Sequence, residues 1–374
     1  MKHLIYADNA ATTQMDVDVF EAMKPYLLHE YGNASQPYSF ARQPKKAIQE
    51  ARETIASCIG ALPEEIYFTS GGTESDNWAI KGIAFRNYDH RAIITTAFEH
   101  HAVLHACEAI ERLGCPVAYM WPDKRGFVSP DSLERYITDE TFLVSVMYAN
   151  NELGSIQPIK ELCKVAHDHG ALFHTDAVQA VGHVAIDVND LGVDMLSASA
   201  HKFNGAKGVG FLYVRTGTTL LPYADGGAQE HGLRAGTENV AGIVSMAVAL
   251  KKNVNDLDKN QRHILKLESL LLQTLNESGI PYVRNGGDHT LPGVISLSFD
   301  GKDGEAILHR MDLMGVCIST GSACDSKNTE ISHVLQAIRM PESLAKGTIR
   351  ISLGKNNTAD DIDTIVTALR KILL

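Results

Sequence analysis

Short apolar runs alternate with segments of helical periodicity from about residue 16 to residue 255. The apolar runs are AIITT (92–96), TFLVSVMY (141–148), ALFHTD (171–176), DMLSAS (194–199) and VGFLYV (209–214). Among the helical segments between them, PIKELCKVAHDHG closes on Gly170, as expected of a helix C-terminus. Continuous apolar strands separated by helices predict an α/β fold with a mainly parallel sheet that is covered on both faces.

The pattern changes after about residue 255. A long polar helix is followed there by short apolar runs and further helices, and the last helix is predicted to begin at Thr358 with Asp361 completing a capping box. A single core rarely grows beyond about 250–300 residues, so the length of the chain predicts two domains. We expect residues 16–255 to form a large domain, and residues 1–15 and 256–374 to form a smaller α/β domain.

Composition narrows the class of protein. Hydrophobic residues make up 44% and charged residues 21% of the chain, which is typical of a globular protein. The net charge of −11, without a run of lysine or arginine, argues against a nucleic-acid-binding surface. The N-terminus lacks the long apolar core of a signal peptide, and no run approaches the ~18 apolar residues of a membrane span. We therefore expect a cytoplasmic protein that binds neither nucleic acid nor membrane.

The pattern of cysteines leaves the role of one of them, Cys324, undecided. The six cysteines include no Cys-x-x-Cys pair, so we expect neither a zinc site nor a thioredoxin-type motif, and no metal ligands. Cys58, Cys107 and Cys163 lie on helical patterns, where a thiol packs as a small hydrophobe. Cys324 instead follows small residues and precedes the polar run DSKN. A filler, a redox partner, a metal ligand and a nucleophile are the alternatives for it.

Polar residues follow two predicted strands at the edge where open parallel sheets bind ligands. ALFHTD ends in Asp176, with Gln179 shortly after, and DMLSAS ends in Ser199 and leads to Lys202. Asp176 and Lys202 could form a structural ion pair. Alternatively, the lysine forms a Schiff base with a cofactor aldehyde while the carboxylate keeps a ring nitrogen protonated.

The segment SGGTESDN (70–77) has the features of a phosphate cradle. Gly72 permits close backbone approach, Thr73 offers a hydroxyl group, and the helix predicted to follow favours an anion at its N-terminus. A Gly-Gly-Thr turn taken alone is equally consistent with an ordinary loop. Together with Ser199, His201 and Lys202, the segment predicts a site for a phosphorylated aldehyde cofactor.

Three further polar residues each have a functional and a structural interpretation. His100 follows AIITT, and its imidazole could stack on a pyridine ring and carry protons. Alternatively, His100 or the adjacent His101 is an ordinary surface or core histidine without a catalytic role. Asn151, in ANNELG, either offers its amide group to a ligand or belongs to an ordinary Asn-rich turn. Arg350 lies in the otherwise apolar GTIRISLG, where it needs either a substrate carboxylate or a structural salt bridge.

Motifs along nearly the whole chain resemble one family. They are YADNAATT (6–13), FTSGGTESDN (68–77), EHHAV (99–103), NNELG (150–154), HTDAVQAVG (174–182), SASAHKFNGAKGVG (197–210), GLRAGTENV (232–240), STGSACDS (319–326) and IRISLG (349–354). In these motifs and their order, the sequence resembles the NifS/IscS-type cysteine desulfurases, which are pyridoxal 5'-phosphate (PLP) enzymes of the class V aminotransferase superfamily. The resemblance implies PLP-dependent transferase fold type I, with a mainly parallel seven-stranded sheet and a smaller C-terminal domain.

The resemblance also implies how PLP is bound. Lys202 would hold the cofactor as a Schiff base, Asp176 would pair with its pyridine nitrogen, and Gln179 would reach its phenolic oxygen. His100 would stack on the ring and move protons. The phosphate would be bound by the hydroxyl, imidazole and backbone groups of Gly72, Thr73, Ser199 and His201, joined by Thr237 of a second subunit. A homodimer follows from this last contact.

For the substrate, the resemblance implies that Arg350 holds the carboxylate of L-cysteine and that Asn151 contacts the substrate or the cofactor. Cys324 would attack the substrate sulfur, which leaves a persulfide on the enzyme and releases L-alanine. A sulfur-acceptor protein, such as an iron–sulfur scaffold or another thiol carrier, would then receive the sulfur. We expect the loop that carries Cys324 to be mobile, because its thiol has to reach both the cofactor and the acceptor.

The sequence departs from the family's usual residues at several positions, among them Ala34, Tyr38, Ala41, Ala200, Ala228, His231 and Ala235. These departures affect the expected shape of the substrate channel and the choice of acceptor more than the chemistry. Three alternatives are a selenocysteine lyase, a PLP-dependent transaminase of the same fold, and a non-catalytic scaffold. The presence of Lys202 argues against the scaffold, and Cys324 argues against a transaminase, which needs no cysteine there.

Overall fold

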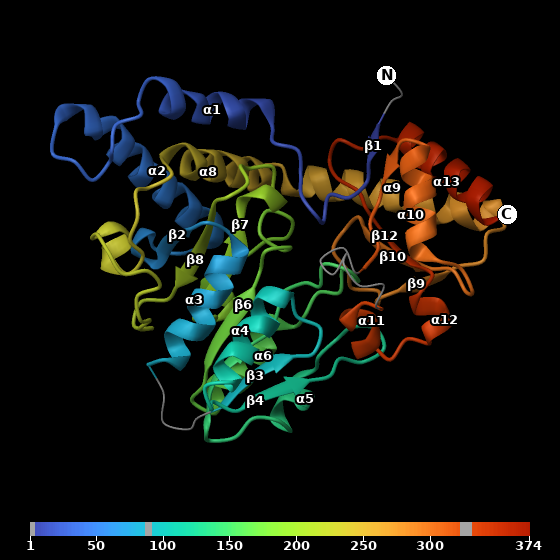
Figure 1. The fold of residues 1–374 in the computed structure, drawn as a ribbon, viewed down its shortest axis with the longest axis horizontal. Helices are drawn as coiled ribbons and strands as arrows, with labels where there is room; N and C mark the ends of the chain where they lie inside the picture. The colour runs from blue at the N-terminus through green and yellow to red at the C-terminus, as the bar shows by residue number, and fades with distance from the viewer. Residues whose placement is uncertain (1–3, 87–91, 322–330) are drawn as a thin grey trace.

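A seven-stranded sheet forms the centre of the larger part of the molecule (Figure 1). The structure, a computed structural model, describes residues 4–86, 92–321 and 331–374. In chain order the strands are β2 (Ile66–Thr69), β3 (Ala92–Thr96), β4 (Val117–Met120), β5 (Thr141–Ser145), β6 (Leu172–Asp176), β7 (Met195–Ser199) and β8 (Gly210–Val214). Their order across the sheet is β2-β8-β7-β6-β5-β3-β4. Only β8 runs antiparallel to its neighbours, so the mainly parallel sheet of the prediction is confirmed.

Helices cover both faces of this sheet, as expected of a parallel sheet with buried strands. Ile55, Leu162 and Leu250 belong to the core on one face, and Trp78 and Val103 to the core on the other. The first face is covered by α2 (Arg42–Ile59), α6 (Ile159–Asp168) and α8 (Val240–Asn255), the second by α3 (Gly72–Ala84) and α4 (His101–Glu111). Three further helices are α1 (Val17–Leu28), which packs on α8, α5 (Pro130–Glu134) and α7 (Val188–Leu191).

A second core lies around a smaller antiparallel sheet of order β12-β10-β9. Its strands are β9 (Val283–Asn285), β10 (Val294–Ser298) and β12 (Thr348–Ser352). The helices that pack into this core are α9 (Leu257–Ser278), α10 (Gly304–Leu313) and α13 (Ala359–Leu373). Two short helices near it, α11 (His333–Ala337) and α12 (Glu342–Ala345), bury their apolar residues in the core of the large sheet. The N-terminal strand β1 (Ile5–Tyr6) pairs in parallel with β11 (Val316–Cys317), so the start of the chain lies beside this part. The domain boundaries at residues 16 and 256 stay a prediction.

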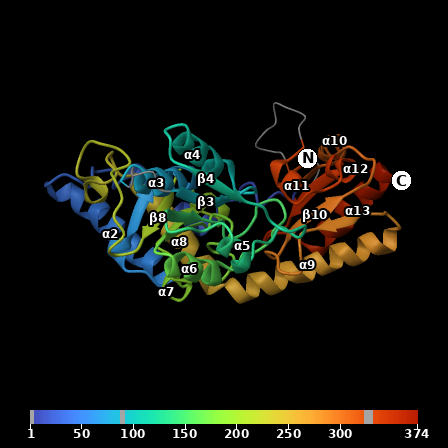
Figure 2. The same ribbon diagram turned by 90° about the horizontal axis from the view of Figure 1, so that it is seen from below.

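The helix α9, seen along one side of the molecule in Figure 2, is amphipathic. Its buried residues include Ile264, Leu267, Leu271 and Leu275, which recur at helical spacing and face the second core. Most of its remaining residues are polar, although Leu265 is also exposed. Within the ranges that the structure describes, no helix combines the length and the apolar character needed to cross a bilayer.

Local sequence signals account for several element ends. The predicted capping box is present, because Thr358 Oγ1 accepts from the amide of Asp361 at 3.3 Å and Asp361 Oδ2 accepts from the amide of Thr358 at 3.0 Å. Gly170, with a φ of 75°, follows α6 as predicted. The run 141–148 is a strand only as far as Ser145, so this strand was predicted too long.

Candidate active site

The carboxyl ends of five strands meet at one edge of the large sheet. β2 leads to Gly72 and Thr73 and β3 leads to His100, while β5, β6 and β7 lead to the remaining predicted residues of the sheet. The predicted site residues that follow β5, β6 and β7 are Asn151, Asp176, Gln179, Ser199, His201 and Lys202. The structure therefore brings these residues to the edge where open α/β sheets bind ligands.

Lys202 ends a 3-10 turn (Ala200–Lys202) that directly follows β7. Its Nζ donates hydrogen bonds to the carbonyl oxygens of Ala10 at 2.6 Å and Ala11 at 2.8 Å. Gln179 Nε2 donates to the same Ala10 oxygen at 3.0 Å. The segment 8–13, which we call the N-terminal loop, thus passes directly beside Lys202. Its motif, YADNAATT, signalled the family, but the sequence did not predict this contact.

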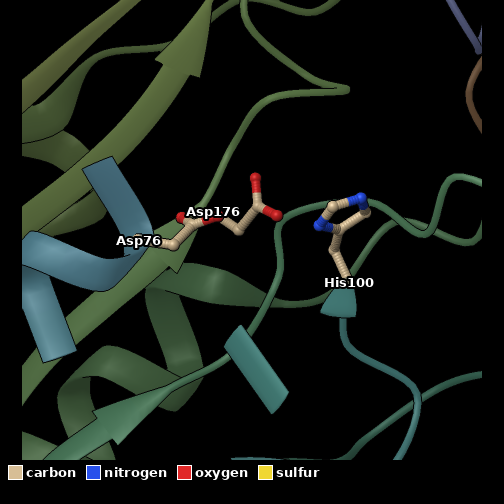
Figure 3. Close-up of side chains that lie close together, drawn as sticks. All are labelled: Asp76, His100 and Asp176. Carbon is tan, nitrogen blue, oxygen red and sulfur yellow. The ribbon is translucent and has the colours of Figure 1, made fainter. Parts of the chain in front are cut away.

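Asp176 lies in a compact group with Asp76 and His100 (Figure 3). One side-chain atom of each residue lies within 4.8 Å of those of the other two. Burial raises the pKa of Asp176 to about 6, against the opposing effects of the hydrogen bond from the Val178 amide and the charge of Lys202. Burial, with the nearby charge of Asp176, also raises the pKa of Asp76 well above its ordinary value. The site thus disfavours two negative charges, and Asp76 is the group held as a neutral acid.

Two buried groups behind Asp176 were missed in the sequence. His174 is held between Ser145 Oγ at 2.9 Å from Nδ1 and Ser197 Oγ at 3.0 Å from Nε2, and burial lowers its pKa to about 3. Glu99 accepts from Thr96 Oγ1 at 2.7 Å and from the Met147 amide at 2.9 Å, and burial raises its pKa to about 8. His174 is therefore neutral and Glu99 largely so at pH 7. For His174, a polar residue within the apolar run ALFHTD was the available signal, whereas Glu99 had none of this kind.

His100 is the N-cap of α4, where its Nδ1 accepts a hydrogen bond from the amide of Ala102 at 3.1 Å. Burial lowers its pKa to about 4, and the charge of Lys202 acts in the same direction. The imidazole is therefore neutral at pH 7. Since Nδ1 is an acceptor, the ring proton lies on Nε2.

A hollow lies where α3 begins, and we call it the Gly72 hollow. The residues that line it include Thr12, Gly72, Thr73, Ser199, His201 and Lys207. A Cβ atom on Gly72 would lie 2.5 Å from Val178 Cγ2, so glycine is needed there. The N-terminus of α3, the hydroxyl groups of Thr12, Thr73 and Ser199, and a lysine together favour an anion in this hollow. His201 Nδ1 contacts Thr12 Oγ1 at 3.1 Å, and burial lowers the pKa of His201 to about 4.

Arg350 reaches the site from the second core. It lies on β12 with only 4% of its surface exposed. Its Nη1 donates to the carbonyl oxygen of Asn151 at 2.9 Å, and its Nη2 pairs with Asp8 Oδ1 at 2.7 Å. The structural salt bridge considered for Arg350 is therefore present, and its partner belongs to the N-terminal loop.

Comparison with known proteins decides the family. The aminotransferase class-V family model matches residues 5–365. A relative named cysteine desulfurase IscS, from Dictyoglomus turgidum, is 48% identical over 375 residues, which covers 100% of this chain and 95% of the relative. The chain belongs to the cysteine desulfurases of the class-V aminotransferase family.

Solved structures agree with this assignment along the full chain. A NifS-like protein superposes with a TM-score of 0.94 at 37% identity, covering 99% of both chains. A structure described as SspA in complex with cysteine has a TM-score of 0.85 at 38% identity, and covers 95% of this chain and 100% of the other. The family resemblance and fold predicted from the sequence are confirmed.

Two residues expected from the family are not among those that line the site in the described part of the chain. Cys324 is outside the residues that the structure describes, so its position is untested. Thr237 is exposed in the segment before α8 and does not line the Gly72 hollow of its own chain. Among the departures from the family pattern, Ala34, Ala41 and Ala200 are buried, whereas Tyr38 and Ala228 are exposed.

Proposed function

We propose that this protein is a PLP-dependent L-cysteine desulfurase, which converts L-cysteine to L-alanine and leaves the sulfur as a persulfide on Cys324. One observation carries the proposal. Lys202, Asp176 and His100 surround the same edge of the sheet as the Gly72 hollow, in a chain whose relatives are named cysteine desulfurases.

The residues present fit PLP. A buried carboxylate such as Asp176, with its raised pKa, gains most from a cationic partner, and a protonated pyridine nitrogen supplies one. The spacing of Asp76, His100 and Asp176 would also suit a metal ion. We favour the ring nitrogen because a lysine able to bond an aldehyde and a hollow suited to a phosphate adjoin the same group. Gly72, Thr73, Ser199 and His201 would hold the phosphate, and Gln179 the phenolic oxygen.

The remaining roles belong to the side chains. Bound PLP supplies an electron sink for the carbon atoms next to the substrate nitrogen. Arg350 would hold the carboxylate of L-cysteine, with Asn151 beside it, and the neutral His100 would accept and return protons. The thiolate of Cys324 would form an S–S bond with the substrate sulfur as the substrate C–S bond breaks. Protonation of the carbon atom released from sulfur then yields L-alanine.

A homodimer is part of the proposal. Large apolar side chains are exposed along α1 and the segment after it, among them Val17 at 79%, Leu28 at 58% and Tyr31 at 70%. Soluble monomers rarely expose such a patch. We propose that a second copy covers it and that Thr237 of this copy completes the Gly72 hollow. A cytoplasmic location and transfer of the sulfur to an iron–sulfur scaffold or another thiol carrier complete the proposal, on the family resemblance.

The decisive variant is Cys324→Ala, tested for alanine and sulfide release from L-cysteine in the presence of a thiol reductant. Loss of the nucleophile should reduce both products by at least about 100-fold. The visible absorbance of bound PLP should be unchanged, because the cofactor does not depend on this thiol. Cys58→Ala, which removes a thiol from α2, is the matched control and should retain activity.

Other outcomes identify the alternatives. Undiminished alanine release by Cys324→Ala would rule out the persulfide mechanism. A keto acid as the product would indicate a transaminase. If the variant loses activity on L-cysteine but keeps it on L-selenocysteine, a selenocysteine lyase activity accompanies the desulfurase.

A further inference from the structure

Arg350 carries a donor that the described part of the protein leaves unpaired. Its Nη1 and Nη2 have partners in Asn151 and Asp8, whereas its Nε is buried without a hydrogen-bond partner. An unpaired buried donor is costly, and native proteins keep few of them. This atom therefore indicates an acceptor that the described residues do not supply, such as a bound ligand.

The orientation of the guanidinium group is fixed by its two bonded nitrogens. Nη2 lies 2.7 Å from Asp8 Oδ1 and Nη1 lies 2.9 Å from the carbonyl oxygen of Asn151. Asp8 is itself held near β12, because the next two amides, of Asn9 and Ala10, donate to the carbonyl and hydroxyl oxygens of Ser352 at 3.1 Å and 2.9 Å. The N-terminal loop thus keeps a carboxylate on one edge of Arg350.

A ligand carboxylate that binds side-on to arginine uses Nε and Nη2. In Arg350 the first of these atoms is free of protein partners and the second is shared with Asp8. A bound ligand carboxylate would therefore lie close to the carboxylate of Asp8. Two like charges so close together in a partly buried site repel each other, and this weakens ligand binding.

We propose that Asp8 is a positioning residue that also sets the affinity of the site for the substrate carboxylate. It aligns the guanidinium group so that Nε faces the ligand, and it reduces the net attraction that Arg350 exerts. The inference rests on the proposed function, in which Arg350 binds the carboxylate of L-cysteine. Its consequence is that the carboxylate-bearing product, L-alanine, is also held weakly and leaves readily.

The test is Asp8→Asn in the PLP-loaded enzyme. An asparagine oxygen can still accept from Nη2, so the variant removes the charge and retains the alignment. The dissociation constant of L-alanine, measured by calorimetry, should fall about tenfold. That of ethylamine, which lacks the carboxylate, should not change. The KM for L-cysteine should fall together with the dissociation constant of L-alanine, and kcat should not increase.

Two further variants make the result specific. Asp16→Asn removes a carboxylate from the same stretch of chain, where Asp16 pairs with Lys252 at 3.1 Å and Lys355 at 2.7 Å, and it should leave L-alanine affinity unchanged. Asp8→Ser removes the charge with a smaller side chain and should also tighten L-alanine binding. It keeps the proposal testable if Asp8→Asn does not fold.

An unchanged or weaker affinity for L-alanine in both Asp8 variants would overturn the inference. An equal change for ethylamine would do so too, because it would show an effect that does not involve the carboxylate. Arg350→Lys separates this failure from a failure of the proposed function. If Arg350 does not bind the carboxylate at all, Arg350→Lys leaves L-alanine affinity unaltered.

Discussion

The site has two sides, and their buried charges are stabilised in different ways. On the side of the large sheet, Asp76, Glu99 and Asp176 are buried near one another, and their pKa values are raised. On the side of β12, Arg350 is equally buried but forms a direct ion pair with Asp8. On the first side, the carboxyl groups limit the negative charge because they retain protons. On the second side, both groups stay charged and form an ion pair.

This difference indicates what each side responds to. The protonated carboxyl groups around Asp176 lose their protons only when a cation, such as a protonated pyridine nitrogen, binds beside them. A preformed ion pair changes when a competing ion, such as a substrate carboxylate, arrives. The sheet side is thus suited to a cofactor that stays, and the β12 side to a ligand that exchanges.

The largest effect is expected on the sheet side, from Asp176→Asn. The amide has nearly the same shape but cannot carry the negative charge that stabilises a protonated ring nitrogen. We expect desulfurase activity to fall about 10²–10³-fold, and the PLP absorbance spectrum to change. Single-turnover kinetics and absorbance titration measure both. Near-normal turnover in this variant would mean that Asp176 has no role toward the ring, and that the cluster is structural.

An intermediate effect is expected on the β12 side, from Arg350→Lys. Lysine keeps the charge and can still pair with Asp8, but it loses the planar fork that binds a carboxylate through two bonds. The KM for L-cysteine should rise about 10- to 100-fold, while kcat changes little. Steady-state kinetics over a wide range of L-cysteine concentrations separates the two constants. A fall in kcat at unchanged KM would place Arg350 in the chemical step instead.

The smallest effect is expected from the ion pair of His167 with Asp194, which lies outside both sides of the site. Its effect on thermal stability provides a reference for a pair that has no role in the site. His167 Nε2 bonds Asp194 Oδ2 at 2.8 Å, and this hydrogen bond raises the pKa of His167 to about 10. Since the folded pKa exceeds the usual value near 6.5, the pair stabilises the fold fully below about pH 6.5, and this contribution is lost as the pH rises toward 10. His167→Asn should lower the melting temperature by a few degrees at pH 6 and by less at pH 10.

The control for this reference is activity, which His167→Asn should leave unchanged at pH 7.5. A melting temperature that drops equally at both pH values would show that packing, and not charge, accounts for the effect. Since 42% of the His167 side chain is exposed, solvent screening keeps the expected effect small.

The sequence predicted the parts of the structure that depend on local pattern. Continuous apolar runs located β3, β6 and β7, and the polar residues after these strands lie at the carboxyl edge of the sheet, as expected, while their roles toward a ligand stay a prediction. The spacing of Thr358 and Asp361 located the start of α13 because a capping box needs only four neighbouring residues.

Contacts between distant segments were not predictable in the same way. The pairing of Asp8 with Arg350 joins residues 342 positions apart, and no local pattern records it. Asp76 occupies the first turns of α3, where a polar residue is common, so nothing in the sequence signalled that it is buried beside Asp176. The grouping of buried acids is a property of tertiary packing.

The N-terminal loop has a consequence for biosynthesis. Its residues leave the ribosome long before those of β11 and β12, yet β1 pairs with β11, and Asp8 pairs with a residue of β12. A nascent chain can therefore form the large sheet while its first dozen residues still lack their partners. The two sides of the site join only when translation has passed Ser352. Until then, Lys202 and Arg350 cannot be brought together, so an incomplete chain lacks part of the candidate site.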